Sequence, residues 1–333
     1  MATQVSEPTA LQSEVRVPLR SSALIIAGAS AKGPYAAGAL SVLARRNDFD
    51  VRCVVGASSG ALNAAVYAAG LRIDEAEVAA KNLCELWRKQ ASWFNILTHS
   101  QRVAIVEKAL LPFLGTRTKR QVLLDIPVAS LQGSLDKYGH MRFERSYKFE
   151  AKSFETRAGI REIAEVCILS ATIPLVFRPR EFRSEQFWDG GLVDATPIGN
   201  ALKRDRSIDH MIVITPDSNV VDTRRRYGRF ALSRLLEMLI EERLARDLSE
   251  AQSFNDELSA LCRAGVDWNQ LGPEIKWKFL QFVEIRPERE LTGNLATGFF
   301  SARVRDEYVS VGHDAAESVL GRWTPQVFPA SGS

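Results

Sequence analysis

The sequence of 333 residues is poor in cysteine. Its four cysteines, Cys53, Cys84, Cys167 and Cys262, are far apart and show no C-x-x-C spacing. This pattern argues against a structural zinc site and fits a protein of the reducing cytoplasm. Cys53 and Cys167 lie in apolar runs, so we expect them to be buried thiols.

A large excess of charge of one sign is also lacking. The formal net charge of +3 is too small to indicate a nucleic-acid partner, although it would not oppose contact with an anionic membrane surface. Hydrophobic residues make up 46% and charged residues 25%, which are the proportions of an ordinary globular protein.

Long apolar runs are missing as well. Residues 53–71 come nearest to a membrane span, but they contain three glycines, two serines and Asn63. We therefore expect a protein that visits lipid surfaces rather than one that spans them. The start of the chain has no apolar core of a Sec signal peptide, so residues 1–21 are predicted to be a disordered leader. Export by a specialised secretion system stays open.

The most informative feature is a Gly/Ser turn in the first quarter. An apolar run at 51–55 leads into Gly56-Ala57-Ser58-Ser59-Gly60, and an alanine-rich helical run follows at 61–69. Strand, Gly-x-Ser-x-Gly, then helix is the layout of a nucleophile elbow, which lifts a serine above the sheet near the positive end of a helix. A plain Gly/Ser loop between two core elements is the alternative.

A second turn of small residues lies upstream, after a strand-like run at 23–27. Small residues let the backbone approach a ligand closely, and N–H groups at a helix start suit the oxyanion of an acyl-transfer intermediate. A phosphate loop and a plain βα turn are the alternatives. The Walker pattern is excluded because Pro34 follows the last glycine, and the dinucleotide fingerprint is incomplete because residue 30 is serine. The loop consists of Gly28, Ala29, Ser30, Ala31, Lys32 and Gly33.

The third element is Asp189-Gly190-Gly191. Taken alone, an aspartate followed by two glycines usually marks a turn. In the order loop, Gly-x-Ser-x-Gly, Asp-Gly-Gly, and together with the segment 170–179, these motifs resemble the patatin-like phospholipase family over about residues 22–204. In that reading, 205–333 is a C-terminal part of helices and strands that completes the same fold.

The resemblance implies both a fold and a chemistry. The fold would be α/β, with three layers and a mostly parallel central sheet covered by helices on both faces. The family uses a Ser–Asp dyad without histidine, so Ser58 would be the nucleophile and Asp189 the proton acceptor in hydrolysis of a phospholipid or other lipid ester. The N–H groups of Ala29 and Ser30 would hold the oxyanion, and Lys32 could add positive charge. No metal and no cofactor are implied.

The loop departs from the family pattern at one place. Family members usually have three consecutive glycines where this chain has Gly28-Ala29-Ser30. The oxyanion donors are backbone groups, but a Cβ costs about 1 kcal/mol wherever the backbone needs a positive φ. The departure leaves two outcomes open, namely an activity that is weaker or narrower than usual, or a loop that becomes ordered only when a ligand binds.

Strand-like and helical runs alternate along the rest of the chain, without repeats or low-complexity segments. Runs at 23–27, 51–55 and 210–215 favour an α/β sheet with helices on both faces. The loosely alternating run 141–151 suggests an edge strand, and 277–285 suggests a late strand.

Two segments could give access to lipid, and the first of them has a basic run ahead of it. Apolar residues recur at helical spacing from Leu232 to Leu248 and predict an amphipathic helix, which is more often core-facing than membrane-bound. The basic run 224–229 could meet phospholipid headgroups, or be ordinary solvated surface. The apolar stretch 91–114 could cover the active site, with core packing as the alternative.

Two other functions are compatible with parts of the pattern. A Ser–His–Asp esterase would need a histidine after the acid, and His313 or His210 has the right order. The second alternative is a protein of the same fold that binds a lipid or a nucleotide without catalysing a reaction. Turnover of a simple ester that is lost in Ser58→Ala separates this alternative from both enzymes.

Overall fold

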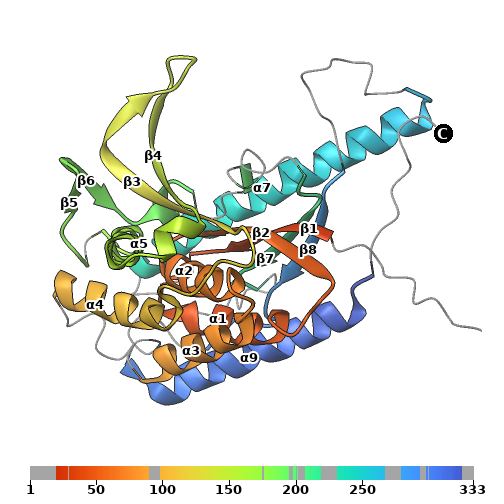
Figure 1. Cartoon of the computed structure of the whole chain (residues 1–333). Coiled ribbons are helices and arrows are strands. Elements are labelled where there is room, and N and C mark those ends of the chain that lie inside the picture. The colour runs from red at the N-terminus through yellow and green to blue at the C-terminus, as the bar shows by residue number, and fades with distance from the viewer. Residues whose placement is uncertain are drawn as a thin grey trace, which may run out of the picture.

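An eight-stranded sheet runs through the middle of the molecule (Figure 1). In a computed structural model of the protein, the described residues are 20–28, 30–89, 98–174, 176–194, 198–199, 201, 207–218, 231–266, 279–292, 298 and 300–324. The strand order is β5-β6-β3-β2-β1-β7-β8, and β4 pairs with β3 outside this path. The strands are β1 (Arg20–Ile26), β2 (Phe49–Gly56), β3 (Leu123–Leu135), β4 (Met141–Phe149), β5 (Arg180–Phe182), β6 (Glu185–Trp188), β7 (His210–Ile214) and β8 (Gln281–Ile285).

The sheet is mostly parallel. Strands β3, β2, β1, β7 and β8 run in one direction, and β4, β5 and β6 add antiparallel pairs at one side. Parallel strands are buried on both faces, so their sequences read as nearly continuous apolar runs. The runs at 23–27, 51–55 and 210–215 correspond to β1, β2 and β7. The run 141–151 contains β4, and the run 277–285 contains β8. These strand predictions are confirmed.

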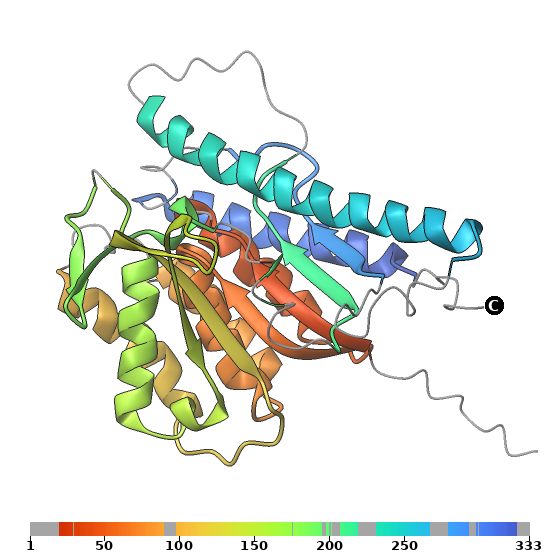
Figure 2. The same ribbon diagram turned by 90° about the horizontal axis from the view of Figure 1, so that it is seen from above.

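Helices cover both faces of the sheet and make three layers (Figures 1 and 2). Because successive residues of a strand point to opposite faces, β1 contributes Leu24 and Ile26 to one core and Ala23 and Ile25 to the other. Leu248 of α7 belongs to the second core, and the other long helices belong to the first. The predicted three-layer α/β fold is confirmed. The helices are α1 (Gly33–Leu43), α2 (Ser59–Leu71), α3 (Ala76–Lys89), α4 (His99–Leu110), α5 (Arg157–Ser170), α7 (Ala231–Arg263) and α9 (Ala302–Arg322).

Elements that follow residue 204 belong to the same sheet and layers as those before it. β7 pairs with β1, and β8 pairs with β7. Helix α9 lies so close to α1 that a Cβ on Gly38 or Gly312 would collide with the backbone of the other helix. We propose that residues 205–333 complete the fold that begins at residue 22. β1 already starts at Arg20, inside the predicted leader 1–21, and residues 1–19 lie outside the described residues.

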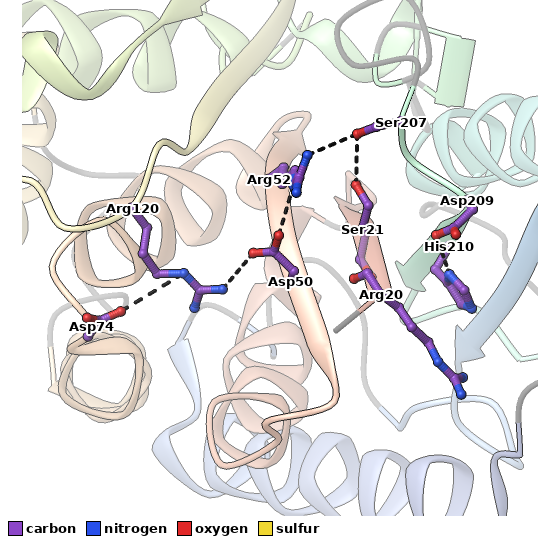
Figure 3. A network of polar contacts seen from close by, with 10 residues as sticks. Arg20, Ser21, Asp50, Arg52, Asp74, Arg120, Ser207, Asp209 and His210 are labelled. Carbon is purple, nitrogen blue, oxygen red and sulfur yellow. Dashed lines mark hydrogen bonds and ion pairs between the residues drawn. The ribbon is translucent and has the colours of Figure 1, made fainter. Parts of the chain in front are cut away.

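A polar network joins the amino ends of the central strands (Figure 3). Asp50 on β2 accepts hydrogen bonds of 2.8 Å from both Arg52 and Arg120. Arg52 also donates to the hydroxyl of Ser207, which lies 3.1 Å from the hydroxyl of Ser21. This edge is opposite to the carboxyl ends of the parallel strands, where ligands bind in open α/β sheets.

The predicted lipid-access segments are described only in part. The basic run 224–229 and residues 91–97 lie outside the described residues. Farther along the stretch 91–114, Leu110 and Phe113 are buried in the core, as is Leu248 of α7. Within the ranges given above, no helix has both the length and the apolar character needed to cross a bilayer.

The prediction that Cys53 and Cys167 are buried thiols is confirmed. Cys53 and Cys167 are buried, and burial raises the pKa of the Cys167 thiol. All four cysteines are free thiols.

Candidate active site

The turn between β2 and α2 carries Ser58. Its backbone has φ 53° and ψ −127°, a region that is costly for a residue with a side chain and is often found at active sites. A Cβ on Gly56 would collide with the carbonyl of Gly60, and a Cβ on Gly60 would collide with the backbone of β1. Both glycines of the pattern are therefore required by close packing. The turn has the geometry of a nucleophile elbow.

Ser58 meets Asp189 inside the protein. The Ser58 hydroxyl donates a 2.7 Å hydrogen bond to Oδ2 of Asp189, and the two residues are only 3% and 5% exposed. The second carboxylate oxygen, Oδ1, accepts from the backbone N–H of Gly191 at 2.8 Å. The aspartate follows β6, and its own N–H donates to the carbonyl of Thr172. The structure thus brings together two residues that are 131 positions apart.

Burial changes the acidity of this aspartate. Loss of solvation raises the pKa of Asp189 from 3.8 to about 7, although the hydrogen bonds from Ser58 and Gly191 act in the opposite direction. Near neutral pH, such a carboxylate can both accept and return a proton. Geometry and acidity therefore suit proton transfer from the serine hydroxyl.

Ser170 is hydrogen-bonded to the backbone of the elbow. No role for it was predicted from the sequence. Its hydroxyl accepts the Ser58 N–H at 2.9 Å and donates to the carbonyl of Pro127 at 2.7 Å. A Cβ on Gly190 would collide with the same Pro127 carbonyl. The Pro127 carbonyl of β3 therefore accepts from Ser170, which bonds Ser58, and also lies against Gly190, which follows Asp189. The only signal in the sequence was the position of Ser170 at the start of the segment 170–179.

The loop after β1 lies against the elbow. A Cβ on Gly28 would come within 3.2 Å of the Ser58 Cβ, so the backbone of the loop approaches the serine closely. Ser30 begins a 3-10 turn, Ser30–Lys32, that leads into α1. Ala29 lies outside the described residues, and the oxyanion hole remains a prediction.

Two residues that the sequence analysis did not single out fix the far end of this loop. Asn63 of α2 donates to the carbonyl of Gly33 at 3.0 Å and accepts from the indole N–H of Trp87 at 2.8 Å. The Trp87 ring packs so closely on Gly33 that it leaves no space for a Cβ there. Asn63 is fully buried, so its hydrogen bonds are formed away from water.

Lys32 is held by a carboxylate rather than exposed to solvent. Its ammonium lies 3.5 Å from Oδ1 of Asp217, which follows β7, and both side chains are less than one-sixth exposed, at 14% and 13%. Asp217 was not singled out from the sequence, because nothing local connects it to a residue 185 positions away.

The histidines lie in other places. His313 on α9 is 3.0 Å from Arg45 and also near Asp314 and Glu317. His210 starts β7 at the amino edge of the sheet, where it contacts Asp209 (Figure 3). Among the interactions of the described residues, no histidine contacts Ser58 or Asp189. The geometry favours the dyad over a triad.

The arrangement of loop, elbow and Asp-Gly-Gly agrees with a family comparison. A family model described as patatin-like phospholipase matches residues 24–202. The chain belongs to the patatin-like phospholipase family. Membership in this family supports lipid acyl hydrolase activity in general, with lipids as the substrates. No curated protein matched the sequence.

Among solved structures, this patatin-like chain is similar to VipD from Legionella pneumophila. The two are 15% identical, with a TM-score of 0.39, and the alignment covers 91% of this chain and 67% of VipD.

Metal-ligating groups do not gather in the part of the chain that the structure describes. There, no group of three or more His, Cys, Asp or Glu side chains could hold an ion. The proposed chemistry below uses only side chains and backbone groups.

Proposed function

We propose that this patatin-like protein is a phospholipase A-type acyl hydrolase that uses Ser58 and Asp189. The observation that carries the proposal is the 2.7 Å hydrogen bond from the serine hydroxyl to a buried carboxylate, at a strained turn. A serine hydroxyl needs a nearby base to become a nucleophile, and Asp189 is the group in place to act as one.

The reaction proceeds in two halves. Asp189 takes the proton of Ser58 while the serine oxygen attacks the ester carbonyl, and the N–H groups of Ala29 and Ser30 hold the resulting oxyanion. Collapse of this intermediate breaks the ester bond, and the leaving alcohol receives the proton from Asp189. Water, deprotonated by Asp189, then attacks the acyl-serine and releases the fatty acid, and the proton returns to Ser58.

Lys32 adds positive charge beside the oxyanion loop. The ion pair of 3.5 Å with Asp217 holds the lysine ammonium at this end of the loop. Such a charge favours an oxyanion or a phosphate nearby.

Contact with membranes is a further part of the proposal, and the β3–β4 hairpin supports it. β3 pairs in parallel with β2 up to Asp125, then continues past the carboxyl edge of the sheet and returns as β4 (Figure 1). Ser58 follows β2 at that same edge. The hairpin exposes apolar side chains of Leu131 (37%), Leu135 (65%), Tyr138 (72%), Met141 (55%) and Phe143 (49%).

At the tip of this hairpin, exposed apolar side chains lie beside one basic group, Lys137. Tyr138 has an amphipathic ring, a type that prefers the membrane interface, and the ammonium of Lys137 lies 4.7 Å from its centre. We place transient contact of the protein with cytoplasmic membranes at this hairpin.

The dyad is tested with an active-site probe and with single substitutions. A fluorophosphonate should label the wild type and not Ser58→Ala, since it reacts with an activated serine. Asp189→Asn should abolish turnover of a p-nitrophenyl ester, whereas His313→Ala and His210→Ala should stay within a few-fold of wild type.

Two results contradict this assignment. Equal labelling of wild type and Ser58→Ala means that another residue is the nucleophile. A loss of about 10³-fold or more in His313→Ala is the loss expected of a triad member and supports the Ser–His–Asp alternative.

A further inference from the structure

A buried arginine on α4 has two guanidinium nitrogens without a hydrogen bond. Arg102 is 1% exposed, and its Nε and Nη1 form no hydrogen bond. Arg72 is equally buried, but its guanidinium donates to the carbonyls of Phe113 and Thr116 and to the hydroxyl of Thr118. Buried charges are normally paired in this way because removal from water is costly. Arg102 therefore stands out within the described part of the chain.

Two further basic side chains lie near Arg102. His99 precedes it by three residues on α4, and Arg180 comes three residues after Phe177, whose ring lies against the Arg102 guanidinium. Arg180 of β5 has a buried Nε without a hydrogen bond, and His99, at the start of α4, has a buried and unbonded Nδ1. Burial, followed by repulsion from Arg180, lowers the pKa of Arg102 to about 10. Burial, followed by repulsion from Arg180 and Arg102, lowers the pKa of His99 to about 4. At neutral pH, His99 is therefore a neutral imidazole beside two cations.

Carboxylates on the neighbouring elements are engaged elsewhere. On α4 and α5, Glu107 and Glu165 pair with Arg161, and Glu162 pairs with Arg183. Glu181 follows Arg180 on β5, but successive residues of a strand point to opposite faces. The charge of the two arginines is thus left uncompensated by the described residues.

The ring of Phe177 fixes how the Arg102 guanidinium is presented. The guanidinium carbon lies 4.0 Å from the ring centre, so the ring covers one face of the group. The N–H groups lie along the edges of a guanidinium, away from the covered face, and those of Nε and Nη1 have no acceptor in the protein. A planar fork of donors suits the oxygens of a phosphate, which can accept several charge-assisted hydrogen bonds at once.

We propose that Arg102, Arg180 and the imidazole of His99 form a binding site for a phosphate group. The two guanidinium groups supply charge and N–H donors, and the imidazole supplies one further N–H. The bound anion removes the repulsion between the two arginines.

The site is connected to the candidate active site by a short segment. Thr172 accepts the N–H of Asp189, and Phe177 follows five residues later, with its own N–H bonded to the carbonyl of Ile173. Five residues span at most roughly 18 Å. A phosphate in the headgroup of a bound phospholipid is therefore one source of the anion, an assignment that rests on the proposed function. A free phosphate is the other source.

The first experiment measures phosphate binding without catalysis. Melting temperatures of the full-length wild type, Arg180→Gln and Arg102→Gln are compared with and without inorganic phosphate, with sodium chloride to keep ionic strength constant. Phosphate should raise the melting temperature of the wild type and have little effect on either variant. Arg180→Gln should also melt higher than the wild type without phosphate, because one of two repelling charges is gone.

Arg178→Gln is the matched control, since Arg178 is an exposed arginine two positions away from Arg180. It should respond to phosphate like the wild type. Arg180 is only partly buried, so Arg180→Gln keeps the test valid if Arg102→Gln fails to fold. An equal response of wild type and Arg180→Gln to phosphate would overturn the proposal.

The second experiment separates the two sources of phosphate. KM is measured for a short-chain phospholipid below its micelle concentration and for a p-nitrophenyl ester of the same acyl length. If the site holds the headgroup, Arg180→Gln should raise KM for the phospholipid about tenfold more than for the other ester. Equal changes for both esters assign the site to free phosphate. If neither ester is hydrolysed, the proposed function fails, and the melting experiment still decides on the site.

Discussion

Two opposite effects act on the carboxylate of Asp189, namely weak solvation and hydrogen bonding. The carboxylate must be poorly solvated to hold a proton near neutral pH, and it must be bonded to stay in place beside Ser58. Burial raises its pKa to about 7, and the N–H of Gly191 fixes one oxygen while the serine hydroxyl contacts the other. The same environment that makes the aspartate a base makes its ionised form costly to bury.

Ser170 is a positioning residue for the elbow, and Ser170→Ala tests this. The substitution leaves the buried N–H of Ser58 and the carbonyl of Pro127 without their partner, which costs about 1–3 kcal/mol. We expect kcat for a soluble ester to fall about tenfold while KM changes little, because the serine is misplaced rather than the substrate.

Ser41→Ala is the control, because the Ser41 hydroxyl bonds only to a carbonyl within α1, that of Gly38. It should leave both kinetic constants unchanged. If Ser170→Ala lowers the melting temperature but keeps wild-type kcat, Ser170 serves stability alone.

Among the elements, the loop after β1 combines a close approach to Ser58 with two residues that are not glycine. A backbone oxyanion donor is worth roughly 10²–10³ in turnover, and a Cβ changes how readily the loop reaches its geometry without removing the N–H. Replacement of Ala29 and Ser30 by glycine together should therefore keep kcat at or above wild type with little change in KM. Steady-state kinetics on a soluble ester measure this.

The opposite outcome is also informative. A collapse of turnover in this double variant, with the fold intact by circular dichroism, would show that the Ser30 side chain has its own role and that backbone donors alone do not account for the loop.

The β3–β4 hairpin is the element that we expect to touch lipid. Leu135→Ser with Tyr138→Ser removes two of its most exposed apolar side chains, at 65% and 72% exposure. Transfer of such side chains out of water is favourable by about 1.5–3 kcal/mol each when complete. Even partial insertion predicts that sedimentation with anionic vesicles falls about tenfold or more.

Val78→Ser provides the control, since Val78 is 45% exposed on α3 and lies outside the hairpin. It should bind vesicles like the wild type. Unchanged vesicle binding of the hairpin variant would place the lipid contact elsewhere.

For the whole molecule, the buried acid makes stability depend on pH in a defined direction. The pKa of Asp189 is about 7 in the folded protein and 3.8 when unperturbed, so between these values the folded state holds a proton that the unfolded state has lost. Stability therefore falls as pH rises through this window, and the loss is complete above pH 7. At about 1.4 kcal/mol per pKa unit, the full effect is a few kcal/mol.

Asp189→Asn should remove this dependence. In urea unfolding, the stability of the variant relative to wild type should be greater at pH 8 than at pH 5. Ser58→Ala keeps the carboxylate and should retain the pH dependence of the wild type. Parallel pH profiles of wild type and Asp189→Asn would mean that Asp189 is ionised in the folded protein throughout this range.

The sequence by itself determined the parts of this protein that depend on near neighbours. Apolar runs predicted the parallel strands β1, β2, β7 and β8 but not β3, and turns of small residues between strand and helix predicted the loop and the elbow. A tight turn needs glycine for steric reasons that act over a few residues, so the role of Gly56, whose Cβ would meet the carbonyl of Gly60, follows from the local pattern. Gly60 faces the backbone of β1 instead, and only the packed sheet brings that strand next to it.

Only the tertiary structure decided which distant side chains meet. The contacts of Ser170 with Ser58, of Asp217 with Lys32 and of Arg102 with Phe177 join residues from separate elements, and no local pattern encodes them. The raised pKa of Asp189 also depends on the tertiary structure, because packing removes the water around its carboxylate. Residue type and spacing specify each element, whereas burial and long-range pairing depend on how the layers pack together.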